Sequence, residues 1–297
     1  MKLLLTGSDG FVGTVLKRHR PCIPLADERG NVDLRDADRL RRAVARIDSD
    51  AVVHLAAQSF VPESFAYPRE TYGINFLGTL NLLEALKSAG FKGRFLYVGS
   101  GDSYGIVAPN ELPIDEAHPL RPRSPYAVSK AAAEALCYQW SQSEAFEIVM
   151  TRSFNHIGPG QSERFVVSNF ARQVIEIRKG IRTAVIRTGD IDVTRDFTDV
   201  RDVAQAYLLL LERGTAGEVY NVCSGSEQSI RDLLSRLLQL AGVQAAVELD
   251  HARLRRSEQR RICGSPGKLE RDTGWTRQYS LDASLTDILN DWEAKLS

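Results

Sequence analysis

Cysteine is scarce in this chain, and its spacing limits what the thiols can do. The four cysteines, Cys22, Cys137, Cys223 and Cys263, are far apart, and no two form a C-x-x-C pair. A disulfide-rich scaffold and a zinc ribbon are therefore excluded, and reduced thiols in a cytoplasmic protein are favoured. We expect no bound metal.

An excess of charge and a long apolar run are also missing. The 38 Lys and Arg residues balance 38 Asp and Glu residues, so there is no positive field to hold a nucleic acid or an anionic membrane. No apolar run approaches a membrane span, and MKLLLTGSDG is too short and too rich in Gly and Asp for a signal peptide. The 297 residues predict one large domain or two coupled domains.

The first half of the chain alternates short apolar runs with helical stretches. KLLLT precedes FVGTVLKRHR, CIPL precedes DADRLRRAVARI, and AVVHLA precedes TYGINFLGTLNLLEALKSAG; FLYVGS and FEIVMTRSF follow. Strands that are apolar throughout are buried on both faces, which is typical of a parallel sheet between helices. The pattern predicts an α/β, Rossmann-type doubly wound parallel sheet.

The rhythm loosens after about residue 155. GEVYNVCS (217–224) is typical of one more buried strand. We therefore predict a dinucleotide-binding domain over residues 1–155, to which the chain returns around 190–224. Residues 156–297 are predicted to form mainly a smaller α/β substrate-binding domain.

A glycine-rich loop follows the first predicted strand and opens the first helix. Glycines three apart allow a tight turn, let the backbone approach a pyrophosphate and let the helix pack on the sheet, and the helix N-terminus supplies amides to phosphates. The alternative is a merely tight strand–helix turn. The predicted cofactor-binding residues of this loop are Gly7, Gly10, Phe11, Val12 and Gly13.

Two further segments are predicted to contact the nucleotide. Asp33 and Leu34 could bond the adenine edge. Asp27, Glu28 and Arg29 occur together where the second strand ends, and an acid there would bind a ribose 2′-hydroxyl whereas an Arg would bind a 2′-phosphate. NADH and NADPH both remain open as cofactors.

The segment SPYAVSK (124–130) places a Tyr one turn before a Lys. Ser124 can cap a helix that starts at Pro125, so Tyr126 and Lys130 share one helix face. In an arbitrary Y-x-x-x-K, the Tyr is simply half-buried and the Lys half-solvated.

The order of TGSDGFVG, FLYVGSGDSYG and SPYAVSK resembles the extended short-chain dehydrogenase/reductases, a family of nucleotide-sugar epimerases, dehydratases and reductases. HLAAQSFVPESF is similar to the family's segment beside the nicotinamide, and INFLGTLNLLEAL to the helix after it. The resemblance implies a catalytic triad of Ser100, Tyr126 and Lys130. It also implies cofactor contacts from Leu55, Ala56, Ala57, Asn75, Tyr126 and Lys130.

The resemblance implies a specific chemistry for these residues. Ser100 would hold the substrate oxygen beside Tyr126, which would donate a proton while the nicotinamide gives a hydride. The ammonium of Lys130 and the positive nicotinamide ring of an oxidised cofactor are together expected to lower the Tyr pKa from about 10 toward the operating pH. In the family, the Lys also bonds the nicotinamide ribose.

Longer segments narrow the resemblance within the family. HLAAQSFVPESF, LYVGSGDSYG, RPRSPYAVSKAAAE, RSFNHIGPGQ, DVTRDFTDVRDV and YNVCSG are together similar to reductases that convert GDP-4-keto-6-deoxy-D-mannose to GDP-D-rhamnose. Related dehydratases carry an acidic pair soon after the Ser or Thr, and here Gly101 replaces the first acid before Asp102. We expect a reductase, with GDP-mannose 4,6-dehydratase or another nucleotide-sugar 4-epimerase or dehydratase as the alternative.

Substrate-binding residues follow from the same resemblance. Arg is favoured for a diphosphate because its fork matches two oxygens at once. HARLRRSEQRR (251–261) contains an R-x-E pattern that the family uses on the nucleotide, although most Arg-rich stretches are solvated faces. The predicted substrate-binding residues are Ser100, Asp102, Asn155, Arg195, Arg256 and Glu258.

Three further expectations complete the sequence-based picture. His54 is expected to be a satisfied core histidine. The helices TYGINFLGTLNLLEALK and SPYAVSKAAAEALCYQW are apolar on more than one face, and the family pairs two such helices from each subunit, so we expect a homodimer through a four-helix bundle. A non-catalytic nucleotide sensor of the same fold typically lacks the Tyr or the Lys, and this chain keeps both.

Overall fold

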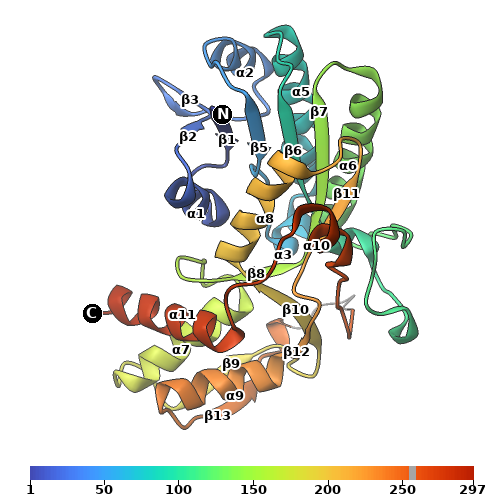
Figure 1. Ribbon diagram of the computed structural model, residues 1–297. Helices are drawn as coiled ribbons and strands as arrows, with labels where there is room; N and C mark the ends of the chain where they lie inside the picture. Colours follow the sequence, from blue (N-terminus) through green and yellow to red (C-terminus); the bar gives the residue numbers. More distant parts are fainter. Residues whose placement is uncertain (254–258) are drawn as a thin grey trace.

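A parallel six-stranded sheet forms the centre of the protein. The computed structural model describes residues 1–253 and 259–297 (Figure 1). The strand order is β11-β7-β6-β5-β1-β2, and every neighbouring pair is parallel. The Rossmann-type α/β fold is confirmed. The strands are β1 (Leu3–Thr6), β2 (Cys22–Pro24), β5 (Ala51–His54), β6 (Arg94–Ser100), β7 (Glu147–Ser153) and β11 (Val219–Val222).

Helices cover both faces of this sheet. Successive residues of a strand point to opposite faces, and apolar residues occupy both. Leu4 and Val52 pack with one set of helices, and Leu3 and Val53 with the other. The first set is α2 (Ala37–Val44), α5 (Gly78–Ser88) and α6 (Pro125–Ser143). The second is α1 (Phe11–His19), α8 (Val200–Arg213) and α10 (Gly267–Thr273).

A second, separate core lies in the lower part of Figure 1. It is built on a three-stranded sheet of order β12-β10-β8 and a pair β13-β9. The strands are β8 (Asn155–Ile157), β9 (Val185–Thr188), β10 (Thr194–Asp199), β12 (Glu227–Ser229) and β13 (Ala246–Leu249). The helices are α7 (Val166–Arg178), α9 (Ile230–Ala241) and α11 (Leu281–Lys295). Between β10 and β12 the chain rejoins the main sheet through α8 and β11.

Short elements lie between these larger ones. The antiparallel hairpin β3 (Ala26–Asp27) and β4 (Gly30–Asn31) follows β2. The π-helix η1 (Gly73–Leu77) leads into α5, and the 3-10 helix η2 (Gly101–Tyr104) follows β6 directly. The others are α3 (Val61–Ala66), α4 (Pro68–Tyr72), η3 (Pro109–Glu111) and η4 (His251–Arg253).

Candidate active site

The carboxyl ends of β1 and β5 meet where the strand order reverses. From β1 the chain goes to β2 on one side and later to β5 on the other, and open α/β sheets bind ligands in the crevice at such a point. A Cβ built on Gly7 would lie 2.8 Å from the backbone nitrogen of Ala56. The segments after the two strands are therefore in close contact at this crevice.

The three glycines of the loop after β1 have different environments. Gly7 has φ +67, which favours glycine, and a Cβ on Gly13 would lie 2.4 Å from the carbonyl oxygen of Gly7. A Cβ on Gly10 would meet only that same oxygen, at 3.2 Å. Gly7 and Gly13 therefore keep the turn closed, whereas Gly10, the N-cap of α1, leaves the helix N-terminus open to a phosphate. The neighbouring Phe11 stacks on His156 of β8.

A directed chain of hydrogen bonds links β1, β5 and α5 beneath this crevice. Thr6 Oγ1 accepts from the backbone N–H of Ala56 and pairs with His54 Nδ1 at 2.8 Å. His54 Nε2 pairs with Thr79 Oγ1 at 2.9 Å, and Thr79 donates to the carbonyl of Asn75. The ring is 2% exposed, and burial lowers its pKa to about 3. The expectation of a satisfied core histidine is confirmed. These hydrogen bonds also hold Ala56 in place beside Leu55 and Ala57.

Asn75 lies inside the π-helix η1 and is 1% exposed. Its Oδ1 accepts from the backbone N–H of Gln58, and its Nδ2 donates to the carbonyl of Gln58 and to Ser129 Oγ. Because both amide hydrogens are used within the protein, this side chain connects the segment after β5 to α6.

The predicted catalytic residues come from two elements. Ser100, 7% exposed, ends β6, and Tyr126 and Lys130 lie one turn apart at the start of α6, capped by Ser124 as expected. Lys130 Nζ donates to the carbonyl of Val98 on β6 at 2.8 Å, and the phenolic oxygen of Tyr97 donates to the backbone carbonyl of Lys130. The start of α6 is thus attached to the carboxyl end of β6.

The electrostatics of Tyr126 differ from the sequence-based expectation. Burial raises the pKa of Tyr126 above its usual value, the charge of Asp102 raises it further, and a hydrogen bond with Ser100 opposes both effects. Lys130 is not among these causes. Among the protein's own residues, desolvation of the phenolate outweighs the hydrogen bond with Ser100, and the lowering of the Tyr126 pKa expected from Lys130 together with an oxidised nicotinamide stays a prediction.

Lys130 itself is strongly affected by its surroundings. Its side chain is 5% exposed, and burial lowers its pKa to about 8. A Lys with this pKa carries its charge at neutral pH but holds it in a poorly solvated place, where it attracts any anionic group that comes near.

The predicted adenine-edge residues lie between β4 and α2. Asp33 is exposed and pairs with Arg35 at 2.7 Å, which lowers the pKa of the Asp33 carboxyl, and Leu34 is 4% exposed. Asp27 accepts two hydrogen bonds from Arg39, at 2.6 and 2.8 Å, and these lower its pKa. The acid at the end of the second strand region is thus bonded to an Arg of α2, whereas Arg29 donates its backbone N–H to Asp27.

The structure describes four of the six predicted substrate-binding residues, Ser100, Asp102, Asn155 and Arg195. Asn155 is an exposed residue of β8, and its Nδ2 lies 3.4 Å from the carbonyl of Asp196. Arg195 on β10 donates from Nη1 to the carbonyls of Thr194 and Gln259. Asp102 is exposed and lies in η2, two residues after Ser100, and its backbone N–H donates to Ser100 Oγ. Arg256 and Glu258 lie outside the described residues.

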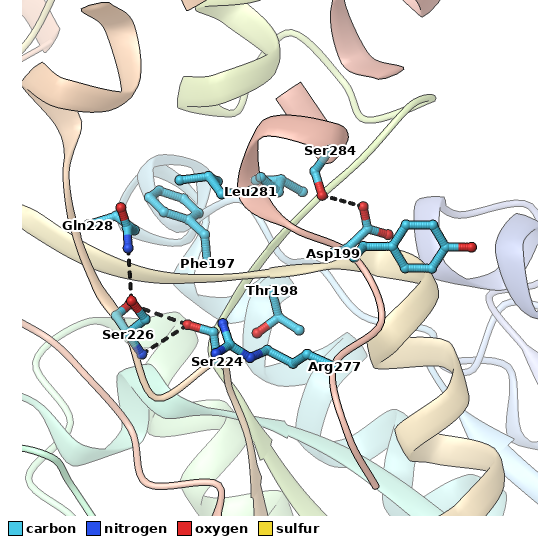
Figure 2. Close-up of a pocket in the computed structure, with 11 residues that line it drawn as sticks. Phe197, Thr198, Asp199, Ser224, Ser226, Gln228, Arg277, Leu281 and Ser284 are labelled. Carbon is cyan, nitrogen blue, oxygen red and sulfur yellow. Dashed lines mark hydrogen bonds between the residues drawn. The ribbon is translucent and has the colours of Figure 1, made fainter. Parts of the chain in front are cut away.

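A small polar cavity lies apart from the predicted catalytic residues (Figure 2). It has a volume of about 30 Å³ between β10, the loop 224–228 and the segment 277–284, with Thr198, Ser226 and Arg277 in its wall. Ligand pockets are typically about 300–1,000 Å³, so this cavity is too small for a nucleotide sugar. Neither Ser100 nor Tyr126 lines it.

One feature near the predicted catalytic residues was not predicted from the sequence. Glu134 on α6 and Arg152 on β7 form a buried ion pair at 2.7 Å. Glu134 lies four residues after Lys130, so helix periodicity would have placed it on the same face as the Tyr and the Lys. Its partner lies 18 residues away on a strand, and no local pattern identifies it.

The profile of the GDP-mannose 4,6 dehydratase family matches residues 28–288. The chain belongs to this family of extended short-chain dehydrogenases/reductases. The GDP-6-deoxy-D-mannose reductase of Pseudomonas aeruginosa is 48% identical over 99% of this chain and 98% of its own length. The solved structure of RMD from Pseudomonas aeruginosa complexed with NADPH has a TM-score of 0.93 and 47% identity, and covers 99% of this chain and 100% of that one.

More distant members keep the same architecture. The UDP-glucose 4-epimerase of Thermus thermophilus, solved in complex with NAD, has a TM-score of 0.85 at 30% identity, and the match covers 98% of this chain and 99% of that one.

Within residues 1–253 and 259–297, no helix is long and apolar enough to span a membrane, and no group of three His, Cys, Asp or Glu residues is arranged to hold a metal ion.

Proposed function

We propose that this protein reduces the C4 ketone of GDP-4-keto-6-deoxy-D-mannose to GDP-D-rhamnose, with NADPH or NADH as the reductant. The observation that carries the proposal is the full-length similarity to a GDP-6-deoxy-D-mannose reductase, together with Tyr126 and Lys130 one turn apart on a helix attached to the strand that ends at Ser100. The protein is accordingly an NAD(P)-dependent oxidoreductase.

The loop after β1 fits the dinucleotide. Gly10 leaves space at the N-terminus of α1 that any Cβ would reduce, and the amides there would hold the pyrophosphate. Phe11, Val12 and Gly13 continue this turn into the helix. Farther along the crevice, Leu55, Ala56 and Ala57 would line the nicotinamide side, and Asp33 and Leu34 would meet the adenine. Asn75 supports this wall through Gln58.

Tyr126 acts as the general acid in this proposal. Reduction of a ketone develops negative charge on the oxygen, and a bound reduced nicotinamide supplies the hydride to the carbon. The Ser100 hydroxyl holds that oxygen, and Tyr126 gives its proton to it. The phenol is neutral at pH 7, which is the form that donates, but burial raises its pKa, so proton transfer needs positive charge nearby to stabilise the phenolate. Lys130 would bond the nicotinamide ribose and stabilise the phenolate that remains.

Gly101 favours a reductase over a dehydratase. A Cβ at this position would lie 3.1 Å from the ring of Phe154, which is 5% exposed and packs with Tyr104 and Ile114. An acidic side chain here would have to displace that ring. Asp102 therefore has no acidic neighbour at 101 with which to perform the two-proton elimination of the dehydratases.

The substrate would extend from Ser100 toward the smaller core. We propose that residues 1–155, with the return around 190–224, hold the dinucleotide, and that 156–297 mainly hold the nucleotide sugar. Asn155, Arg195 and Asp102 would contact the sugar diphosphate. Arg256 and Glu258 remain predicted ligands of the nucleotide.

We further propose a cytoplasmic homodimer. Apolar side chains of α4, η1 and α6 are exposed although these elements contact one another, and such a patch is usually covered by a partner. The patch consists of Tyr72 (36% exposed), Leu77 (50%), Val128 (38%) and Tyr138 (54%). A second copy presenting the same helices would cover it as a four-helix bundle.

The decisive experiment supplies purified protein with GDP-4-keto-6-deoxy-D-mannose and either NADPH or NADH. We expect loss of the nicotinamide absorbance in a one-to-one ratio with a GDP-rhamnose product, identified by NMR. A dehydratase or an epimerase recycles its cofactor internally. If a GDP-sugar is converted without net consumption of reduced cofactor, the reductase proposal is wrong and the alternative holds.

A further inference from the structure

Three residues of α6 on one face are each attached to the sheet. Tyr126, Lys130 and Glu134 are spaced four apart, so they follow one another along the helix. Tyr126 bonds with Ser100 at the end of β6, and Lys130 donates to Val98 within β6. Glu134 makes the third attachment, and it reaches the next strand, β7.

Arg152 on β7 makes an unusually complete set of hydrogen bonds to this face. Its Nε and Nη2 donate to the two carboxylate oxygens of Glu134 at 2.7 to 3.2 Å. Its Nη1 donates to the phenolic oxygen of Tyr104 at 2.9 Å and to the carbonyl of Glu116 at 3.0 Å. The guanidinium also lies over the Tyr104 ring, 4.8 Å from its centre. One planar group therefore binds α6, η2 and the 114–116 loop in fixed relative positions.

Tyr104 carries this restraint to Ser100. It is the last residue of η2, the single turn whose N-cap is Ser100, and its side chain is fully buried. Its hydroxyl accepts from Arg152 and donates to Asn221 Oδ1 on β11 at 2.8 Å. The turn that begins at Ser100 is thus held at its far end by the same Arg that holds the helix of Tyr126.

A role in stability alone does not account for this arrangement. Both side chains are nearly buried, at 8% exposure for Arg152 and 10% for Glu134, so their mutual attraction is offset by the loss of hydration. Replacing such a pair with apolar residues of similar size is often neutral or stabilising. An apolar pair would lack the hydrogen bond from Arg152 to the Tyr104 hydroxyl.

We propose that Arg152, with Glu134 and Tyr104, is a positioning group that sets the distance between Ser100 and Tyr126. This inference rests on the proposed reductase function, in which the two hydroxyls act on one substrate oxygen. Arg152 does not contact the substrate; it acts by holding η2 against α6. A misplacement of about 1 Å between reacting groups can slow a reaction about 10²-fold.

The test combines a charge-free double variant with a single hydroxyl deletion. Glu134→Leu/Arg152→Met removes both charges together, so that no unpaired charge is left buried, and Tyr104→Phe removes only the hydroxyl that links Arg152 to η2. We expect kcat to fall at least about tenfold in the double variant and about threefold or more in Tyr104→Phe, with cofactor Kd and substrate KM within about threefold of wild type.

The matched control is Glu144→Gln. It breaks the exposed Lys87–Glu144 ion pair at the other end of the same helix and should leave kcat and KM unchanged. The Tyr104→Phe variant decides the question if the double variant does not fold. Folded variants that keep wild-type kcat would overturn the positioning role. Wild-type protein that does not reduce the substrate would instead contradict the proposed function, so the two failures are distinguishable.

Discussion

The glycines of the loop after β1 allow a prediction in which one substitution affects cofactor binding and another affects stability. Gly10→Val should abolish tight cofactor binding and leave the protein folded, whereas Gly13→Ala should destabilise it. The structure gives the reason: a Cβ on Gly13 would lie 2.4 Å from the Gly7 carbonyl oxygen and 2.8 Å from that of Ser8, both backbone atoms that cannot move aside. A Cβ on Gly10 has one neighbour, at 3.2 Å.

The size of the effect follows from the position of Gly10. It is the N-cap of α1 with φ −72 and ψ 173, an extended conformation that Val adopts readily, so the cost in folding free energy is about 1 kcal/mol for a poorer cap. Its side chain would keep the pyrophosphate from the amides of the first turn. A lost hydrogen bond to a charged group costs about 1.5–3 kcal/mol, which corresponds to about a 10- to 150-fold weaker Kd.

Calorimetric titration with NADPH and NADH measures the cofactor Kd, and thermal unfolding measures the change in stability. Gly90→Ala serves as a backbone control, because Gly90 also has a positive φ but nothing lies within 4 Å of a Cβ there. Its stability should fall through strain, with cofactor Kd unchanged. A folded Gly10→Val protein whose Kd stays within threefold of wild type would refute the phosphate-loop assignment.

Three other predictions concern catalysis, charge and assembly. Tyr126→Phe should lower kcat by about 10²- to 10⁴-fold with little change in KM, and a variant that keeps a tenth of wild-type turnover would show that Tyr126 is not the acid. Lys130→Met should weaken cofactor binding in calorimetry yet stabilise the protein at pH 7 by up to about 3 kcal/mol, since burial lowers the Lys130 pKa from 10.5 to about 8. Between these pH values the unfolded chain binds more protons than the folded one, so wild-type stability should rise with pH. The extra stability of Lys130→Met over wild type should therefore disappear near pH 10.5 in denaturant titrations. If that difference does not change with pH, the Lys130 charge is not its origin. Tyr138→Glu should give a monomer in sedimentation at micromolar concentration if α6 forms the dimer contact, and a wild-type protein that is already monomeric would exclude the dimer.

The features that sequence patterns predicted correctly are those decided by neighbouring residues. The apolar strands of the main sheet follow from composition over a few consecutive positions. The cap at Ser124 and the shared face of Tyr126 and Lys130 follow from one turn of helix, since side chains four apart always lie on one side. The turn at Gly7 requires a positive φ that its own sequence permits.

The tertiary structure decided what depends on burial and on partners far along the chain. The pKa of Tyr126 rises because neighbouring elements partly bury the phenol and place Asp102 near it, an effect that no spacing between Tyr and Lys encodes. Asn75 is enclosed between Gln58 and Ser129, so its hydrogen bonds are used before any cofactor arrives. The sequence by itself determined the α/β sheet, the glycine turn after β1 and the Tyr–Lys face, because those need only local geometry. The attachment of that face through Glu134 to Arg152 arose only when β7 packed beneath α6, because a helix and the strand that follows it come into contact only when both pack in the folded sheet.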